Sequence, residues 1–363
     1  MRFSVMIFYG GPSYEHDVSI MSAKNIIDFL KTKKNLLIYP VYIDKKGRWY
    51  LTDLNLDRIK KLCGIVYDFT GRFFIIGGKR VVPDVCFSII HGNLGEDGKL
   101  QGFFETISAV YSGCDVLSSA IAMNKKLSKT IAKLNGVSVL DDVTFSLVDF
   151  KTNKQKILDE IKKLGLPVFV KPNNLGSSVG VFKVKRFDGI ERMIKKSFEY
   201  DDVVMVEKGL ERPKEVVCGV LLDNGEIYVS RCGEVVVSKK HEFYDYNAKY
   251  IDPNGMQLKI PADITKDVEE KIQKYSAVIF KAIGGFGFSR VDFFVDRNDN
   301  SVYFCEINTI PGFTSHSLFP SLFKYSGVDL NNQLKIIITG GFFRNKRINK
   351  AKLERIRKVF ENE

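Results

Sequence analysis

A polar turn between two short segments rich in aromatic and β-branched residues limits the fold of this chain more than any other feature. The segments read R-V-D-F-F and Y-F-C-E-I-N, and the turn covers residues 296–300. This pattern predicts a β-hairpin. If the turn is centred on Asp299, Asp292 lies opposite Glu306. Asn308 then shares the face of Glu306, because side chains alternate along a strand.

Two carboxylates that face each other repel, so the hairpin calls for a positive charge between them. Mg²⁺ selects carboxylate and amide oxygens together with substrate phosphates. We therefore predict that Asp292, Glu306 and Asn308 bind a divalent cation. The alternative is a solvated hairpin with scattered acids. The neighbouring Phe293 and Phe304 favour the metal site, because they indicate that the hairpin is buried around its acids.

A second candidate site is the segment V-F-V-K-P-N-N-L-G-S-S-V-G at 168–180. It reads as an apolar strand that ends at Lys171 and is followed by a loop of small residues. Backbone N–H groups and hydroxyls in such a loop can approach phosphate oxygens closely. The loop lacks the G-K-[ST] ending of a P-loop and the G-x-G-x-x-G spacing of a dinucleotide turn. Only together with Lys171 and the metal hairpin does it predict a phosphate site.

Length and composition restrict the class of protein. The chain has 363 residues, 45% of them hydrophobic, which favours two or three globular domains. No apolar run approaches the about 18 residues of a membrane span, and the apolar start reads as a first strand rather than a signal peptide. The six cysteines are dispersed without a C-x-x-C pair. We expect a cytoplasmic protein with reduced cysteines, not bound to membranes.

The formal net charge of +12 raises the question of nucleic acid. Much of the excess lies in 344–358, which holds eight lysines and arginines and predicts a terminal helix. We interpret it as a solvated basic helix face. No nucleic-acid-binding module accompanies it, and basic charge alone supports only nonspecific association. No specific nucleic-acid partner is expected.

Six segments in one order carry a family resemblance. The chain resembles the D-alanine:D-alanine ligase family of ATP-grasp carboxylate-amine ligases over nearly its whole length. The resemblance implies an enzyme that joins two D-alanine molecules through an acyl phosphate, for peptidoglycan synthesis. The matching segments are G-G-P-S-Y-E-H-D-V-S (10–19), H-G-N-L-G-E-D-G (91–98), M-N-K (123–125), V-K-P-N-N-L-G-S-S-V-G (170–180), F-Y-D-Y-N-A-K-Y (243–250) and E-I-N-T-I-P-G-F-T-S-H-S (306–317).

The implied fold is a three-domain ATP-grasp fold of the α/β class, with ATP held between the central and C-terminal domains. The strand and helix pattern of the first part agrees with a parallel α/β layer. The expected divisions are an N-terminal α/β substrate domain (1–120, with an elaboration at 43–83), a central domain (121–212), and a C-terminal domain (213–363) with a lid loop (240–256) and the metal hairpin (290–308).

The resemblance also implies roles around the two D-alanine molecules. Glu15 would hold the first ammonium group, with Ser177 and Tyr250 in a hydrogen-bonded set above it. For Glu15 the plain alternative is a complement to a helix dipole. His91 would lie beside the first substrate, unless it is only a buried structural histidine. The remaining assignments are Ser317 for the second carboxylate, and Arg290 with the backbone N–H of Gly312 as oxyanion donors.

ATP would be bound by a larger group of residues, with Mg²⁺ or Mn²⁺, two ions in number. Lys125 could instead be a solvated helix face, and Glu215 a solvated loop acid. Lys171 has the stronger case, because a charge at the end of an apolar strand needs a partner. The implied contacts are Lys125, Lys171, Ser177 and Lys249 at the phosphates, Lys171 also toward adenine, Glu207, Lys208 and Leu210 at the adenine, and Glu215 at the ribose.

Rival functions remain open at this point. One is a ligase that joins D-alanine to D-lactate or D-serine; the intact aromatic lid at 244–250 favours the dipeptide. The other is a noncatalytic nucleotide-binding protein, which the retained Asp292, Glu306 and Arg290 argue against. The resemblance further implies a homodimer formed largely by the N-terminal domain.

Overall fold

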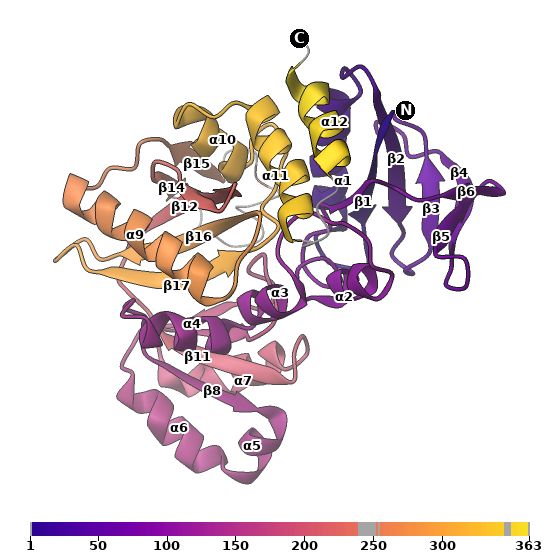
Figure 1. The fold of residues 1–363 in the computed structure, drawn as a ribbon. Helices are drawn as coiled ribbons and strands as arrows, with labels where there is room; N and C mark the ends of the chain where they lie inside the picture. The colour runs from indigo at the N-terminus through magenta and orange to yellow at the C-terminus, as the bar shows by residue number, and fades with distance from the viewer. Residues whose placement is uncertain (1, 239–251, 253–254, 345–349, 362–363) are drawn as a thin grey trace.

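The computed structural model describes residues 2–238, 252, 255–344 and 350–361. The elements form three sheets with helices packed around them, and the first strand and the last helix that the structure describes lie near each other (Figure 1). Most of the predicted lid, and with it Lys249 and Tyr250, lies outside the described residues. Among the helices that are described, none is long and apolar enough to cross a lipid bilayer.

The first sheet has seven strands in the order β6-β5-β4-β3-β2-β1-β7. Only β1 with β2 and β1 with β7 pair in parallel, and the strands of the predicted elaboration extend the sheet in antiparallel fashion. Every residue of β1 is buried, as expected for a central parallel strand. The strands are β1 (Phe3–Gly10), β2 (Leu36–Ile43), β3 (Trp49–Thr52), β4 (Lys61–Asp68), β5 (Phe73–Ile76), β6 (Lys79–Val81) and β7 (Val85–Ser88), with helices α1 (His16–Leu30) and α2 (Lys99–Thr106).

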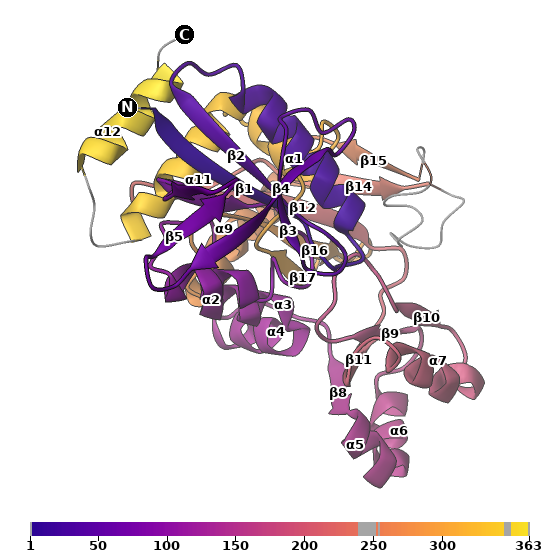
Figure 2. The ribbon, with the colours of Figure 1, turned by 90° about the vertical axis from the view of Figure 1, so that its right-hand side faces the viewer.

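The second sheet is antiparallel, in the order β10-β9-β11-β8, and has its own apolar core. It forms a lobe that projects from the rest of the molecule (Figure 2). Its elements are β8 (Asp142–Ser146), β9 (Val168–Pro172), β10 (Phe182–Val184), β11 (Val203–Lys208), α5 (Leu147–Thr152), α6 (Lys154–Lys163), the 3₁₀ turn η1 (Phe187–Gly189) and α7 (Ile190–Ser197).

The third sheet holds the predicted metal hairpin and runs in the order β15-β14-β12-β16-β17, with β13 paired to β12. Two helices that precede the central lobe, α3 (Val116–Met123) and α4 (Lys125–Leu134), pack against this sheet. Its own elements are β12 (Lys214–Asp223), β13 (Glu226–Val229), β14 (Gly233–Val237), β15 (Met256–Lys259), β16 (Phe288–Val295), β17 (Val302–Asn308), α9 (Lys266–Ala282), α10 (Leu318–Tyr325) and α11 (Leu330–Arg344).

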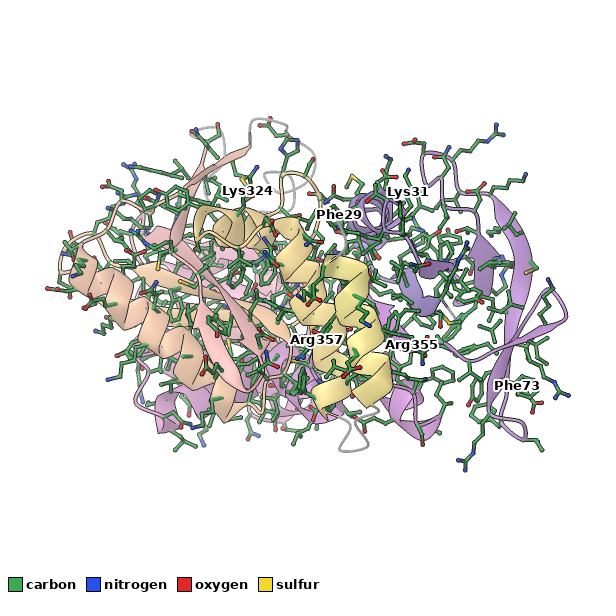
Figure 3. The ribbon with its side chains drawn as sticks, turned by 45° about the horizontal axis from the view of Figure 1, so that its top comes forward. Phe29, Lys31, Phe73, Lys324, Arg355 and Arg357 are labelled. Carbon is green, nitrogen blue, oxygen red and sulfur yellow. The ribbon has the colours of Figure 1, made fainter. Side chains whose placement is uncertain are left out.

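The terminal helix α12 (Lys350–Glu361) is not only a solvated basic face. It lies between the elements of the first sheet and those of the third sheet (Figure 3, where Arg355 and Arg357 on this helix are labelled). Ile356 and Phe360 are buried in one apolar core that also contains residues of β1, α10 and α11. On its polar side, Lys352 pairs with Asp84 at 2.8 Å. The helix therefore ties the end of the chain to the first sheet.

Candidate active site

The hairpin of β16 and β17 has the predicted pairing. Asp292 lies opposite Glu306, and Arg290 opposite Asn308. A bulge between Asp292 and Phe293 makes this pairing possible. Nearer the turn the register is shifted by one residue, so that Phe293 pairs with Phe304. The side chains of Asp292, Glu306 and Asn308 are all partly buried.

Each carboxylate of the hairpin has a cation beside it. Arg290 donates two hydrogen bonds to Asp292, and the Lys125 ammonium lies 3.4 Å from Glu306. Asn308 accepts a hydrogen bond from the backbone N–H of Ile310. In the described part of the chain, no cluster of three or more His, Cys, Asp or Glu residues could hold a metal by itself. Two carboxylates and one amide do fit a hard cation that takes its other oxygens from phosphate and water.

A carboxylate and a hydroxyl from distant parts of the chain meet above the end of β1. Ser177, in the glycine-serine loop, donates a hydrogen bond to Glu15, the residue before α1. Gly92, from a third segment, lies against Glu15. A side chain at position 92 would collide with Glu15, because its Cβ would lie 2.6 Å from the carboxylate. The resemblance predicted the meeting of Glu15 with Ser177, and the structure brings the two together.

His91 is fully buried between α1 and the loop after β17. Its Nδ1 lies 2.8 Å from the Ile310 carbonyl and therefore donates to it, and its Nε2 lies 3.1 Å from the Ser22 hydroxyl. Glu96 lies 3.9 Å from the ring. Burial lowers the pKa of His91, but Glu96, together with smaller effects of Glu15 and the Ile310 carbonyl, more than offsets this, so the pKa is raised. Burial raises the pKa of Glu96 to about 7.

The loop after β17 is held against α1 by two hydrogen bonds. The backbone N–H of Phe313 donates to Ser22 at 3.1 Å, and Asn25 donates to the Phe313 carbonyl at 2.7 Å. Ser317 accepts a hydrogen bond from the N–H of Thr314. Its hydroxyl would be 2.8 Å from a Cβ at position 312, so Gly312 allows this close approach.

These groups surround one cavity of about 1130 Å³. The residues that line it come from segments beside each of the three sheets. Among the predicted site residues, those that line it are Glu15, His91, Lys125, Ser177, Arg290, Glu306, Asn308, Gly312 and Ser317.

The other predicted residues that the structure describes do not line this cavity. Lys208 is exposed, while Leu210 and Glu215 are partly buried at the junction of the second and third sheets. Asp292 does not line it either, but it pairs with Arg290, which does. Lys249 and Tyr250 fall outside the described residues, so their predicted roles stay predictions.

A buried ion cluster joins α4 to the second sheet. Glu207 accepts from Lys171 at 2.7 Å through one carboxylate oxygen and from Lys129 through the other. Burial alone would raise the pKa of Glu207, but Lys171 and Lys129 lower it to about 2. The predicted partner for Lys171 is thus present. Lys129 was missed, although its position four residues after Lys125 places both on one helix face.

Three sheets with their helices meet at one junction, where cations, a carboxylate hairpin and a glycine-serine loop are gathered. This is the organisation of an ATP-grasp carboxylate-amine ligase. Family models agree: "D-ala D-ala ligase N-terminus" matches residues 4–114 and "D-ala D-ala ligase C-terminus" matches 131–339. The chain belongs to the D-alanine–D-alanine ligase family.

Curated relatives and solved structures extend over almost the whole chain. A D-alanine–D-alanine ligase of Caldicellulosiruptor bescii is 37% identical, covering 95% of this chain and 96% of its own. One of Thermoanaerobacter pseudethanolicus is 39% identical, covering 92% and 95%. The VanG D-Ala:D-Ser ligase of Enterococcus faecalis superposes with a TM-score of 0.82 at 34% identity, covering 94% and 100%. The D-alanine-D-alanine ligase of Coxiella burnetii gives 0.80 at 32%, covering 100% and 99%.

Proposed function

We propose that this protein joins two D-alanine molecules to D-alanyl-D-alanine, using ATP and an acyl phosphate, and so supplies peptidoglycan synthesis. The observation that carries the proposal is the composition of the cavity of about 1130 Å³. It holds the Glu15 and Ser177 pair on one side, Lys125 and Arg290 beside the hairpin, and the loop of Gly312 on the other.

In the first step a carboxylate oxygen of the first D-alanine attacks the γ-phosphorus of ATP, and the bond to ADP breaks. Glu15 would hold the substrate ammonium, with His91 beside it. Phosphoryl transfer is mostly positioning and charge neutralisation, which suits Lys125 and Lys171. Asp292, Glu306 and Asn308 would hold the divalent metal. By family resemblance this is Mg²⁺ or Mn²⁺, with two ions in the site. When bound, the metal would neutralise further negative charge on the phosphates.

In the second step the amine of the second D-alanine attacks the acyl carbon. A tetrahedral oxyanion forms, the bond to phosphate breaks, and the amine loses a proton. Arg290 and the N–H of Gly312 are the proposed oxyanion donors, and such donors act strongly because they are already oriented. Ser317 would bind the second carboxylate.

The nucleotide would extend from this cavity toward the second sheet. By their positions in the family pattern, Glu207, Lys208 and Leu210 would border the adenine, Glu215 the ribose, and Lys249 the phosphates. Tyr250 would complete a lid over Ser177 and Glu15, because closure protects an acyl phosphate from water. We further propose a cytoplasmic homodimer, in keeping with the use of ATP and with the family resemblance.

The proposal is tested by phosphate release from ATP in the presence of single amino or hydroxy acids, with mass analysis of the products. Release that requires D-alanine and yields its dipeptide supports it. The structural likeness to the VanG D-Ala:D-Ser ligase makes D-serine the second candidate for the attacking amine. A mixed dipeptide formed in preference, when both amino acids are present, would assign that function instead. ATP binding without any product would indicate a noncatalytic protein.

A further inference from the structure

The buried cluster of Lys129, Glu207 and Lys171 contains more positive than negative charge. The side chains are exposed by only 1%, 3% and 9%, respectively. Lys129 also donates to the Leu140 carbonyl at 2.9 Å, so its ammonium is fixed from two sides. Buried charges are costly unless paired, and here one carboxylate serves two ammonium groups. The cluster therefore has a formal charge of +1.

The two lysines differ in what they can reach. Lys129 is the more deeply buried, and its ammonium donates to Glu207 and to the Leu140 carbonyl. Lys171 lies on β9, which leads directly into the glycine-serine loop. Burial lowers the pKa of Lys171, but Glu207, and after it Cys305 and Glu306, raise it by more, so the pKa is raised. Lys171 is thus the member of the cluster that the proposed function assigns to the nucleotide, and its place just before this loop agrees with that role.

We propose that Lys129 is a positioning residue for nucleotide binding: it serves as the permanent counter-ion of Glu207 and so leaves the Lys171 ammonium for an anionic nucleotide. This inference rests on the proposed function for the identity of the nucleotide. Without Lys129, Glu207 and Lys171 would form a neutral pair. A nucleotide could then recruit Lys171 only by leaving a buried carboxylate with no cation, which is strongly unfavourable.

The direct test compares Lys129→Met with Lys126→Met. Lys126 lies on the same helix and also pairs with a carboxylate, Asp142, at 2.8 Å, but Lys126 is exposed and lies outside the buried cluster, so it is a matched control for charge and helix. ATP affinity is measured by calorimetry with Mg²⁺ and without D-alanine. Lys129→Met should bind ATP about tenfold to a hundredfold more weakly, the range expected for one charged hydrogen bond. Lys126→Met should bind like the parent.

Kinetics separate this role from a merely structural one. In Lys129→Met the KM for ATP should rise, while the KM for D-alanine at saturating ATP should stay unchanged. A general loosening of the site would raise both. The variant should fold, because the remaining Glu207 and Lys171 still neutralise each other. If it does not, Lys129→Arg keeps the charge, and a folded Lys129→Arg protein that binds ATP tenfold more weakly would contradict the counter-ion role.

The decisive variant is the double substitution Lys129→Met with Glu207→Gln. Its glutamine cannot hold Lys171 as an ion pair, so the cluster returns to a charge of +1. Both carboxylate oxygens of Glu207 accept from the two lysines, so we assign its adenine contact to the backbone, which survives the change. ATP affinity should recover most of the loss seen in Lys129→Met. Additive or worse binding, or parental affinity in Lys129→Met itself, overturns the proposal.

These binding measurements do not depend on ligation. A parent protein that binds ATP but forms no dipeptide removes the proposed function and leaves the role of Lys129 open to the same test. A parent that forms the dipeptide, together with a double variant that shows no recovery, removes only the role of Lys129.

Discussion

The guanidinium of Arg290 and the carboxylate of Asp292 form a two-point ion pair, with Nε–Oδ1 and Nη2–Oδ2 distances both 2.7 Å. The two residues lie on one face of β16 because they are two positions apart. The pair links a proposed oxyanion donor to a proposed metal ligand. Arg290 therefore has two proposed roles, and different measurements on one variant can distinguish them.

Arg290→Met is expected to impair the chemical step more than ATP binding. Its proposed contact strengthens as negative charge develops on the acyl oxygen, and loss of one such donor typically costs about 10²-fold in kcat. The KM for ATP should change much less. Asp292 also loses its partner, so Mg²⁺ should raise the Tm of the variant more than that of the parent.

Steady-state kinetics and thermal unfolding with and without Mg²⁺ check this expectation. Arg297→Met is a suitable control, because Arg297 lies at the exposed turn of the same hairpin and donates to the Arg212 carbonyl. A loss confined to the KM for ATP would contradict the oxyanion role.

Glu306→Gln should preserve the fold and weaken the dependence on metal. The amide is nearly isosteric with the carboxylate, but it lacks the charge that binds a hard cation. Substitution of a residue that only hydrogen-bonds to a metal ligand commonly lowers metal affinity or activity by about 10- to 100-fold. Substitution of a direct ligand should lower them at least as much. Turnover is measured against Mg²⁺ concentration. Parental activity at limiting Mg²⁺ would remove Glu306 from the metal site.

Ser22→Ala should weaken binding of the second substrate, although Ser22 is not expected to touch it. The hydroxyl is fully buried and accepts from the Phe313 N–H, on the loop of Gly312 and Ser317. Its loss leaves buried polar groups unsatisfied, at a cost of about 1–3 kcal/mol in the free energy of unfolding.

Ser19→Ala is the control for stability alone. Ser19 is equally buried on α1, but it bonds to Gly10 and Ile89 rather than to the loop after β17. Both variants should lose stability, and only Ser22→Ala should raise the KM for the second D-alanine. Equal kinetic effects would show that α1 matters only as a scaffold.

Glu96→Gln should become more stable relative to the parent as pH rises. Burial raises the pKa of Glu96 from 4.5 to about 7, so between these values the folded protein keeps a proton that the unfolded chain releases. Stability from this group is present below pH 4.5 and lost as pH rises through 7. His91, whose pKa is also raised, acts in the same direction.

The glutamine variant lacks this titration. Thermal unfolding of both proteins from about pH 5 to about pH 8 should therefore show a difference that grows in favour of Glu96→Gln. A difference that stays constant with pH would show that Glu96 is ionised in the folded protein throughout.

The sequence by itself determined the features that depend on neighbouring residues. The pairing of Asp292 with Glu306 follows from a turn and from the alternation of side chains, both of which are local. The need of Lys171 for a partner follows from its place at the end of an apolar strand. The bulge beside Asp292 was not predicted, because aromatic residues stand on both faces near the turn, so either register brings Phe304 opposite a phenylalanine, Phe293 or Phe294.

Only the tertiary structure decided which distant residues meet. Ser22 and Phe313 are 291 positions apart, and the short polar side chain of Ser22 is like any other on an amphipathic helix until the loop is placed against it. Lys129 likewise reads as a solvated helix position, and it became part of the site because α4 packs beside the strand of Glu207. The apolar side of α12 found its core on the first sheet, at the opposite end of the chain. Such contacts depend on how separate elements pack, and composition and periodicity describe each element only by itself.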